Sequence, residues 1–210
     1  MSRPPADFSA DLADSHGEGG EPEWCAAYDR LWPGAKTRDM RQDGPHQRQG
    51  IDRILYLPDG NRVTIDEKIR RHDFGDYLLE LWDKFTAWED RRPGWLTDPE
   101  KRCTHLAYLV LPTRTCTLLP LNETRRAWAQ FGPEWRRAAG TGLEGGRFDR
   151  WMEHALRCEQ RTSHVGRAGF SLSLSGTKGM YGDSRWRTLS IHVPPHALLA
   201  AITAVMVVQW

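Results

Sequence analysis

The sequence lacks the signals of a secreted, membrane-bound or zinc-knuckle protein. Its four cysteines, Cys25, Cys103, Cys116 and Cys158, lie far apart and form no Cys-x-x-Cys pair, which argues against a zinc knuckle and fits reduced thiols. The N-terminus shows no basic-then-apolar leader, and the longest apolar run, residues 197–208, is too short to cross a bilayer. We therefore expect a cytoplasmic protein without a membrane partner.

Motifs for two common kinds of chemistry are also missing. No Gly-x-Ser-x-Gly elbow is present, so the sequence does not support a serine hydrolase. The eight histidines show no metal-ligand spacing, because His192 and His196 are separated by two prolines and cannot share a helical face. Metal binding by histidine is therefore not expected.

The composition is that of an ordinary globular chain. With 210 residues, 39% hydrophobic and 27% charged, it is long enough for one sizeable core. Its net charge of +1 is unevenly distributed, because residues 1–23 contain six acids and one arginine and leave +6 on the rest. This asymmetry is compatible with a polyanion ligand, but a solvated tail needs no ligand, and both explanations stay open. We expect residues 1–21 to form a disordered acidic tail and residues 22–210 to form a single domain.

Residues 50–68 predict a β-hairpin. Two runs rich in β-branched and aromatic residues flank a Pro-Asp-Gly triplet at 58–60, which is a strong turn signal. Proline presets φ for the first turn position, and glycine tolerates the left-handed conformation that follows. The triplet therefore predicts a type I turn with a glycine bulge, in which Leu57 faces Asn61.

Counting back from this turn places Asp52 directly opposite Asp66. Period-2 alternation puts both acids and Lys68 on one face of the hairpin. The other face carries an apolar set: Leu55, Leu57, Val63 and Ile65. Two opposed carboxylates destabilise a bare hairpin by roughly 0.2–1 kcal/mol, and a divalent cation between them reverses that sign. Two acids and an ammonium over one spot are what metal-assisted phosphodiester hydrolysis requires.

A different turn would remove this site. A two-residue Asp-Gly turn pairs Asp52 with Glu67 and Arg53 with Asp66, which leaves an ordinary ion pair. In the glycine-bulge register, alternation points the Glu67 side chain to the apolar face, so we expect that side chain to be structural.

Periodicity predicts further elements along the chain. Helices are expected at 22–31, 123–130, near Pro133, at 148–158 and from His196 onwards. Strands are expected at 105–111, 115–119, 170–174 and 186–193. Residues 35–49 read as a basic loop, and residues 73–88 fit either a helix or a strand.

The order of residues in 47–82, QRQGIDRILYLPDGNRVTIDEKIRRHDFGDYLLELW, contains a familiar pattern. One strand carries an acid, Asp52, and the next carries acid-x-Lys, which is Asp66 and Lys68. This pattern resembles the PD-(D/E)xK nuclease superfamily, although no proline precedes Asp52. It is also similar to uncharacterised phage and bacterial members that share Gln-x-x-Gly-Ile-Asp-Arg, Ile-Asp-Glu-Lys and Gly-Asp-x-Leu-Leu-Glu segments. The resemblance covers about residues 22–137.

The resemblance implies an α/β fold with a restriction-endonuclease-like mixed central β-sheet flanked by helices. It also implies an endonuclease that cleaves DNA with Mg²⁺ or Mn²⁺. Asp52, Asp66 and the backbone carbonyl of Glu67 would hold the metal, while Lys68 would orient the attacking water and stabilise the transition state. The residues themselves indicate only phosphodiester chemistry, and DNA as the substrate comes from the resemblance.

Several neighbouring residues are weaker candidates for the site. The resemblance favours a strand at 76–83 and singles out Glu80 as a third catalytic acid, with a sheet-edge carboxylate as the alternative. Glu23 is similar to the superfamily's occasional helical acid, although a solvated first-turn glutamate is the simpler interpretation. Gln49, Arg70 and Arg71 are assigned to DNA contact, where plain solvation is the alternative.

Two other classes of function compete with a nuclease. One is a catalytically inactive nuclease-like module that binds DNA, or a subunit of a phage or bacterial DNA-processing complex. Retention of both acids and the lysine argues against it. The other is a structural phage protein, which exposed and distant hairpin acids would support. Substrate specificity and oligomeric state, a homodimer included, are left open by the sequence.

Overall fold

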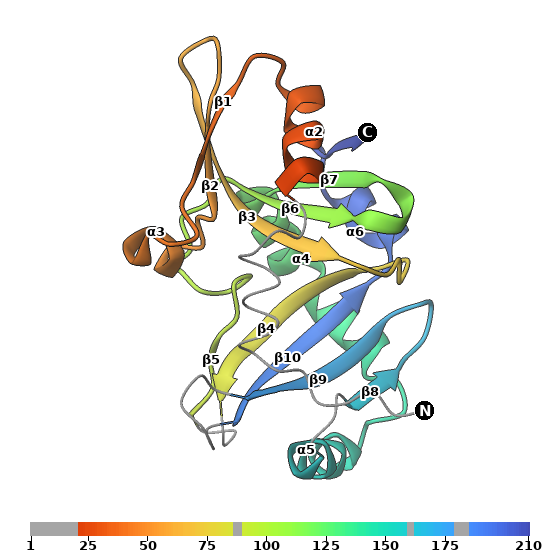
Figure 1. Cartoon of the computed structure of the whole chain (residues 1–210). Coiled ribbons are helices and arrows are strands. Elements are labelled where there is room, and N and C mark those ends of the chain that lie inside the picture. The colour runs from red at the N-terminus through yellow and green to blue at the C-terminus, as the bar shows by residue number, and fades with distance from the viewer. Residues whose placement is uncertain (1–20, 86–89, 159–161, 179–184) are drawn as a thin grey trace. The chain divides into compact units, whose positions relative to one another are not determined.

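The computed structural model describes residues 21–85, 90–158, 162–178 and 185–210 (Figure 1). Within them the chain is mixed α/β, with a mixed central sheet and several helices. It divides into two compact units: the six-stranded unit (21–74, 99–126 and 199–210) and the five-stranded unit (the described part of 75–98 and 127–198). Residues 1–20 of the predicted acidic tail lie outside the described residues, and the single domain stays a prediction.

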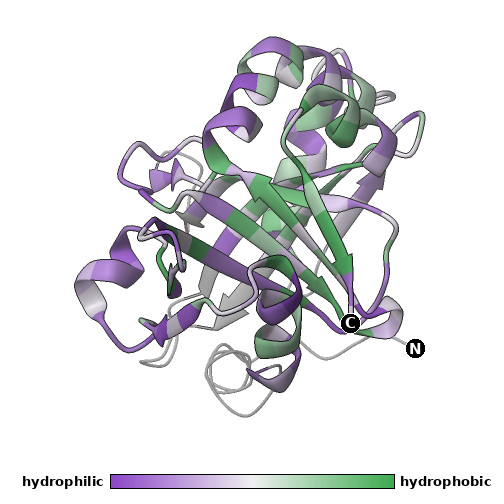
Figure 2. Ribbon diagram, turned by 90° about the horizontal axis from the view of Figure 1, so that it is seen from above, coloured by the Kyte–Doolittle hydropathy of each residue, from purple (hydrophilic) through white to green (hydrophobic). Residues whose placement is uncertain are grey.

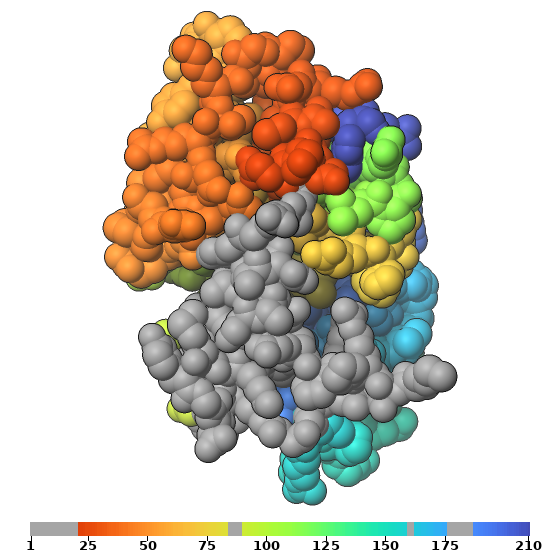
Figure 3. Space-filling model, viewed as in Figure 1, coloured from red at the N-terminus to blue at the C-terminus, as the bar shows by residue number. Residues whose placement is uncertain are grey.

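The six-stranded unit contains the predicted mixed sheet. Its strands follow the order β1-β2-β3-β6-β7-β11. Their bounds are β1 (Lys36–Asp39), β2 (Arg53–Tyr56), β3 (Arg62–Arg70), β6 (His105–Val110), β7 (Thr115–Pro120) and β11 (Met206–Gln209). β3 and β6 pair in parallel and every other neighbouring pair is antiparallel. Helices α2 (Glu21–Leu31) and α3 (Gly44–Arg48) belong to the same unit. Together with β1 they form one continuous red-to-orange surface in Figure 3.

The turn of the β2–β3 hairpin is the predicted one. The N–H of Leu57 donates to the carbonyl oxygen of Asn61 at 2.9 Å. Gly60 has a φ of +86°, the left-handed conformation that the bulge position requires.

The register that follows from this turn is confirmed. Arg53 pairs with Ile65, so the next position along each strand sets Asp52 opposite Asp66. The N–H of Asp52 donates to the carbonyl oxygen of Ile65 at 2.8 Å. The alternative two-residue turn, with Arg53 paired to Asp66, is excluded.

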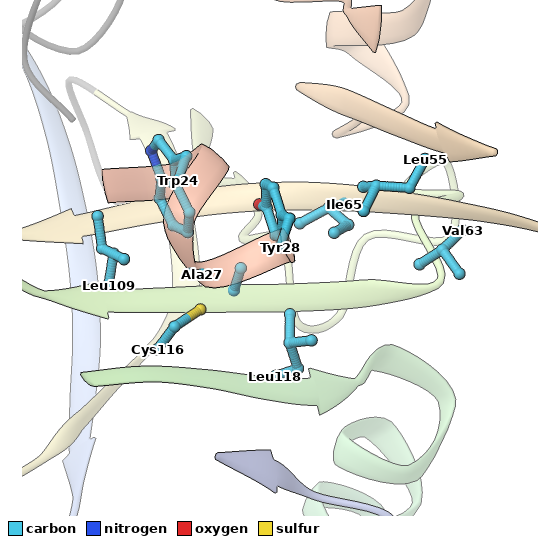
Figure 4. Close-up of a cluster of buried hydrophobic side chains, with 10 residues drawn as sticks. Trp24, Ala27, Tyr28, Leu55, Val63, Ile65, Leu109, Cys116 and Leu118 are labelled. Carbon is cyan, nitrogen blue, oxygen red and sulfur yellow. The ribbon is translucent and has the colours of Figure 1, made fainter. Parts of the chain in front are cut away.

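Helix α2 covers the apolar face of this hairpin. Its residues Trp24, Ala27 and Tyr28 recur at helical spacing and are all buried. Figure 4 shows them packed against strand residues Leu55, Val63, Ile65, Leu109, Cys116 and Leu118. The rings of Trp24 and Tyr28 stack with centroids 5.6 Å apart. The predicted apolar face is therefore part of the core.

The predicted basic loop at 35–49 is wrong, because it contains β1 and α3. All four residues of β1 are exposed, so the strand shows no hydrophobic alternation that would reveal it. Helix α3 begins with a proline in its first turn, and the Asp43 carboxylate accepts a hydrogen bond from the N–H of His46 at 3.2 Å.

The five-stranded unit contains an antiparallel sheet that was not anticipated. Its order is β5-β4-β10-β9-β8. The bounds are β4 (Tyr77–Phe85), β5 (Arg92–Pro93), β8 (Thr162–Val165), β9 (Ser171–Lys178) and β10 (Arg185–Val193). The amphipathic helix α5 (Arg147–Arg157) packs Met152 and Ala155 against Leu174 and Leu189. Strands 76–83, 170–174 and 186–193 are thus confirmed, whereas β5, β8 and, in the six-stranded unit, β11 were missed.

The remaining elements are η2 (Leu111–Thr113), α4 (Leu121–Ala139) and α6 (Pro195–Ala201). The two helices predicted around residues 123–133 form one helix, α4, which continues through Pro133. Aromatic contacts span the proline, with the Trp135 ring 6.3 Å from Trp128 and 6.1 Å from Phe131 between centroids. These contacts offset the hydrogen bond that proline removes.

Hydrophobic residues lie mainly along the strands, and hydrophilic residues cover the loops and the outer sides of the helices (Figure 2). None of the helices in the described part of the chain has both the length and the apolar character of a membrane span.

Candidate active site

Asp52 lies directly before β2, and its carboxylate is fixed against β3. Its Oδ2 atom accepts a hydrogen bond from the N–H of Glu67 at 2.8 Å. The Asp52 carboxylate thus accepts the hydrogen bond that a backbone carbonyl accepts in regular strand pairing. It does so at the point where the pairing of β2 with β3 ends. This contact orients the Asp52 carboxylate beside Asp66, which lies within β3.

Asp66 and Lys68 form an ion pair on the same face of β3. The Nζ atom of Lys68 is 2.7 Å from Oδ1 of Asp66. The Asp66 side chain is only 6% exposed, whereas that of Lys68 is 32% exposed. The ammonium therefore joins a buried carboxylate to a position that solvent and substrate can reach.

The two acids act on each other electrostatically. Burial, followed by the negative charge of Asp66, raises the pKa of Asp52 to about 7, while the positive charge of Lys68 opposes the shift. Burial and the repulsion from Asp66 therefore favour a proton on Asp52 near neutral pH. The structure brings together the three residues that the sequence predicted to meet.

The donor set fits a small hard cation. Among the described residues, no group of three or more histidine, cysteine, aspartate or glutamate side chains is placed to hold a metal ion. Mg²⁺ often binds through one or two carboxylates and takes its remaining oxygens from water and substrate phosphate. Asp52 and Asp66 offer such a pair, and their mutual repulsion favours a cation between them. The role of the Glu67 carbonyl stays a prediction.

The Glu67 side chain points to the α2 side, as alternation predicts. Its Oε1 atom accepts hydrogen bonds from Arg53 Nε at 2.5 Å and from the Tyr28 hydroxyl at 2.9 Å. Arg53 is 1% exposed and also binds Glu21, at 2.8 and 2.6 Å, and Arg41 binds the same glutamate at 2.9 Å. The buried Arg53–Glu67 pair of this ionic cluster supports the hairpin on the face opposite the acids.

This ionic cluster was not predicted from the sequence, although the position of Arg53 indicated it. Alternation places Arg53 on the same face as Leu55, and an arginine at an inward position needs charged partners. Glu21 and Glu23 both lie in the first turn of α2, and Glu21 is the one that binds Arg53, so a role for Glu23 in the site stays a prediction.

Glu80 belongs to the other sheet. It lies on β4 of the five-stranded unit, where it pairs with Ser190, and its backbone packs closely against Gly94. A Cβ atom at Gly94 would lie 2.4 Å from the Glu80 carbonyl oxygen. Glu80 thus lies in the five-stranded unit and Asp52, Asp66 and Lys68 lie in the six-stranded unit, and the role of Glu80 as a third acid stays a prediction.

The predicted DNA-contact residues have unlike environments. Gln49 and Arg71 have exposed side chains. The guanidinium of Arg70 lies over the rings of Phe74 and Tyr108, 5.7 Å from each centroid, which is a cation–π arrangement. Arg70 therefore has a packing role whether or not it meets a phosphate, and contact of all three residues with DNA stays a prediction.

No family could be assigned by comparison. A scan against protein-family models and searches of curated proteins and of solved structures found no significant match. The nuclease superfamily thus remains a resemblance in residues 47–82, and the functional interpretation depends on the site itself.

The five-stranded unit contains a Ser–His–Asp chain that no sequence motif announced. His192 Nε2 is 2.8 Å from Ser173 Oγ, and His192 Nδ1 is 3.0 Å from Asp76 Oδ2. Ser173 is only 2% exposed and lies within β9, which pairs with strands on both sides. The N–H groups of β9 form hydrogen bonds to the neighbouring strands, so they cannot form an oxyanion hole. We interpret this chain as an internal polar network.

Proposed function

We propose that this protein is a Mg²⁺-dependent nuclease that hydrolyses DNA phosphodiester bonds at Asp52, Asp66 and Lys68. One observation carries the proposal: the β2–β3 hairpin holds Asp52, directly before β2, against β3, where the Asp66 carboxylate is 2.7 Å from the Lys68 ammonium. DNA as the substrate, and the restriction-endonuclease-like form of the fold, are carried over from the resemblance in residues 47–82.

Each residue has a distinct role in the proposed reaction. Asp52 and Asp66 would hold the metal, which when bound lowers the pKa of water and offsets charge on the phosphate. The Lys68 ammonium would orient the attacking water and stabilise the negative charge that accumulates in the transition state. Its contact with Asp66 holds it at the acids, and its partial exposure leaves it accessible to substrate.

The Lys68→Ala variant tests this assignment. Losing one electrostatic donor in the transition state typically lowers the rate by about 10²–10³-fold, whereas one phosphate contact contributes far less to binding. We expect Lys68→Ala to be nearly inactive in Mg²⁺, with DNA affinity in Ca²⁺ within a few-fold of the wild type. The assays are nicking and linearisation of a plasmid, with short duplex and branched substrates in parallel. Lys36→Ala, an exposed lysine on β1, is the matched control and should stay active.

Two results would contradict the proposal in different ways. If the wild type binds these DNAs but cuts none of them in Mg²⁺ or Mn²⁺, the protein is a binding module rather than an enzyme. If it neither binds nor cuts DNA, the resemblance extends to local structure alone.

A further inference from the structure

A second lysine lies beside the acid pair, on a loop that sequence analysis did not single out. We propose that Lys101 binds a phosphate oxygen of the substrate at this site. The inference rests on the function proposed above and adds the residue that holds the substrate backbone against the acids.

Hydrogen bonds to residues near both acids tie down the loop that carries Lys101. The N–H of Arg102 donates to the Gln49 carbonyl oxygen at 2.8 Å, and the N–H of Thr104 donates to the Thr64 carbonyl oxygen at 2.8 Å. The Thr104 hydroxyl also accepts from the N–H of Thr64 at 3.0 Å. Gln49 and Thr64 precede the two acids by three and two residues. The position of the loop relative to the acids is therefore set by backbone contacts.

The aliphatic stem of Lys101 crosses the backbone of Gly50. Gly50 has a φ of +66°, and a Cβ atom there would lie 2.8 Å from Lys101 Cδ and 3.7 Å from Lys101 Cε. The same point is 3.4 Å from Asp66 Oδ2. The lysine stem and the Asp66 carboxylate thus both border the space above Gly50. Glycine adopts the left-handed conformation there and also leaves the space that the lysine occupies.

The two lysines have different relations to Asp66. Lys68 binds Oδ1, whereas the Lys101 stem passes on the Oδ2 side. Among the described residues, no carboxylate forms an ion pair with the Lys101 ammonium. Arg125 lies next to Lys101 and donates a hydrogen bond to its carbonyl oxygen at 3.5 Å. A phosphate bound by the Lys101 ammonium would therefore break no ion pair of that lysine.

From this geometry we infer different roles for Lys68 and Lys101. Lys68 is held by an acid of the site, so it acts where charge develops during the reaction. Lys101 carries no such restraint, so it binds the phosphate equally in the ground state and in the transition state. Uniform binding of this kind lowers KM and leaves kcat unchanged.

Lys101→Gln tests the inference. We expect it to raise Kd for duplex DNA in Ca²⁺, and KM in Mg²⁺, by about tenfold. This factor corresponds to the lower end of the free energy that a hydrogen bond to a charged group contributes. The slope of log K against log salt should fall by about one, and kcat should stay within about twofold. Lys101→Arg, which keeps the charge, should restore affinity. Lys36→Gln is the matched control, since it removes the same charge from exposed β1.

The outcomes separate this inference from the proposed function. Equal affinities for Lys101→Gln and Lys36→Gln, with unchanged melting temperatures, would overturn the role of Lys101 while leaving the nuclease intact. A wild type that binds DNA but does not cut it would overturn the nuclease, and the Kd comparison would still decide the role of Lys101. Absence of DNA binding by the wild type would overturn both.

Discussion

At the scale of single residues, the environment of Asp52 decides how the site responds to pH. Burial and the neighbouring Asp66 raise the pKa of Asp52 from an ordinary 3.8 to about 7. The folded chain therefore holds a proton on Asp52 more tightly than the unfolded chain does. Between about pH 4 and pH 7 the unfolded chain has already released this proton while the folded chain still holds it, so the free energy of unfolding falls as pH rises and levels off above about pH 7.

We accordingly expect Asp52→Asn to flatten the pH dependence of stability in the absence of metal. The wild type should lose more stability than the variant between pH 5 and pH 8, because asparagine has no proton to release. Urea denaturation at several pH values measures this difference. Asp29→Asn, an exposed acid on α2, is the control and should follow the wild type. A steeper fall for Asp52→Asn than for the wild type would contradict the repulsion between the two acids.

At the scale of elements, the contact between α2 and the hairpin includes a buried ionic cluster. Burial raises the pKa of Glu67, while Arg53 and the Tyr28 hydroxyl oppose that shift. The Glu67 Oε2 atom has no hydrogen-bond partner in the described part of the chain. The ionised form of Glu67 therefore depends chiefly on Arg53, which also holds Glu21 at the start of α2.

Arg53→Met should destabilise the protein strongly. Breaking a buried ion pair by removing one partner typically costs about 3–5 kcal/mol, because the other charge stays buried without compensation. The double variant Arg53→Met/Glu67→Gln should recover part of this loss, since no charge is left buried at position 67. Chemical denaturation of both single variants and the double variant gives the coupling energy. A purely additive cycle would show that the two side chains do not depend on each other.

At the scale of the whole molecule, the uneven charge distribution predicts how the chain meets a polyanion. Residues 1–20 contain four acids and one arginine, so removing them raises the formal net charge of +1 by three. Glu21 has to be retained in such a truncation, because its carboxylate binds Arg53 and Arg41.

We expect deletion of residues 1–20 to tighten DNA binding several-fold at low salt. Like charges repel the phosphate backbone over a Debye length of about 30 Å at 0.01 M salt and only about 8 Å at 0.15 M, so the gain should shrink as salt is added. Fluorescence anisotropy of labelled duplex in Ca²⁺ across a salt series measures it. A gain that persists unchanged at high salt would point to direct occlusion rather than charge.

Features that depend on neighbouring residues could be predicted from the sequence. The Pro-Asp-Gly turn determined the hairpin register, and the register determined that Asp52, Asp66 and Lys68 meet. Hydrophobic spacing determined α2 and the strands β6 and β7. These features are local, because the turn and the alternation each depend on a few neighbouring residues. The three site residues lie on or next to a single hairpin, so local rules were enough to bring them together.

Features that depend on distant segments were decided by the tertiary structure. Strand β4 was expected from its sequence, yet nothing in that sequence tells that Glu80 pairs with Ser190 in a second sheet. Exposed β1 has no alternation, and α4 continues through Pro133, with aromatic rings in contact on both sides of it. The Lys101 stem lies over Gly50 because its loop forms hydrogen bonds to Gln49 and Thr64, about 40–50 residues earlier in the chain. Pairing between segments far apart in the chain produces no periodic pattern in either segment. The hairpin could therefore be predicted from the sequence, whereas the elements around it could not.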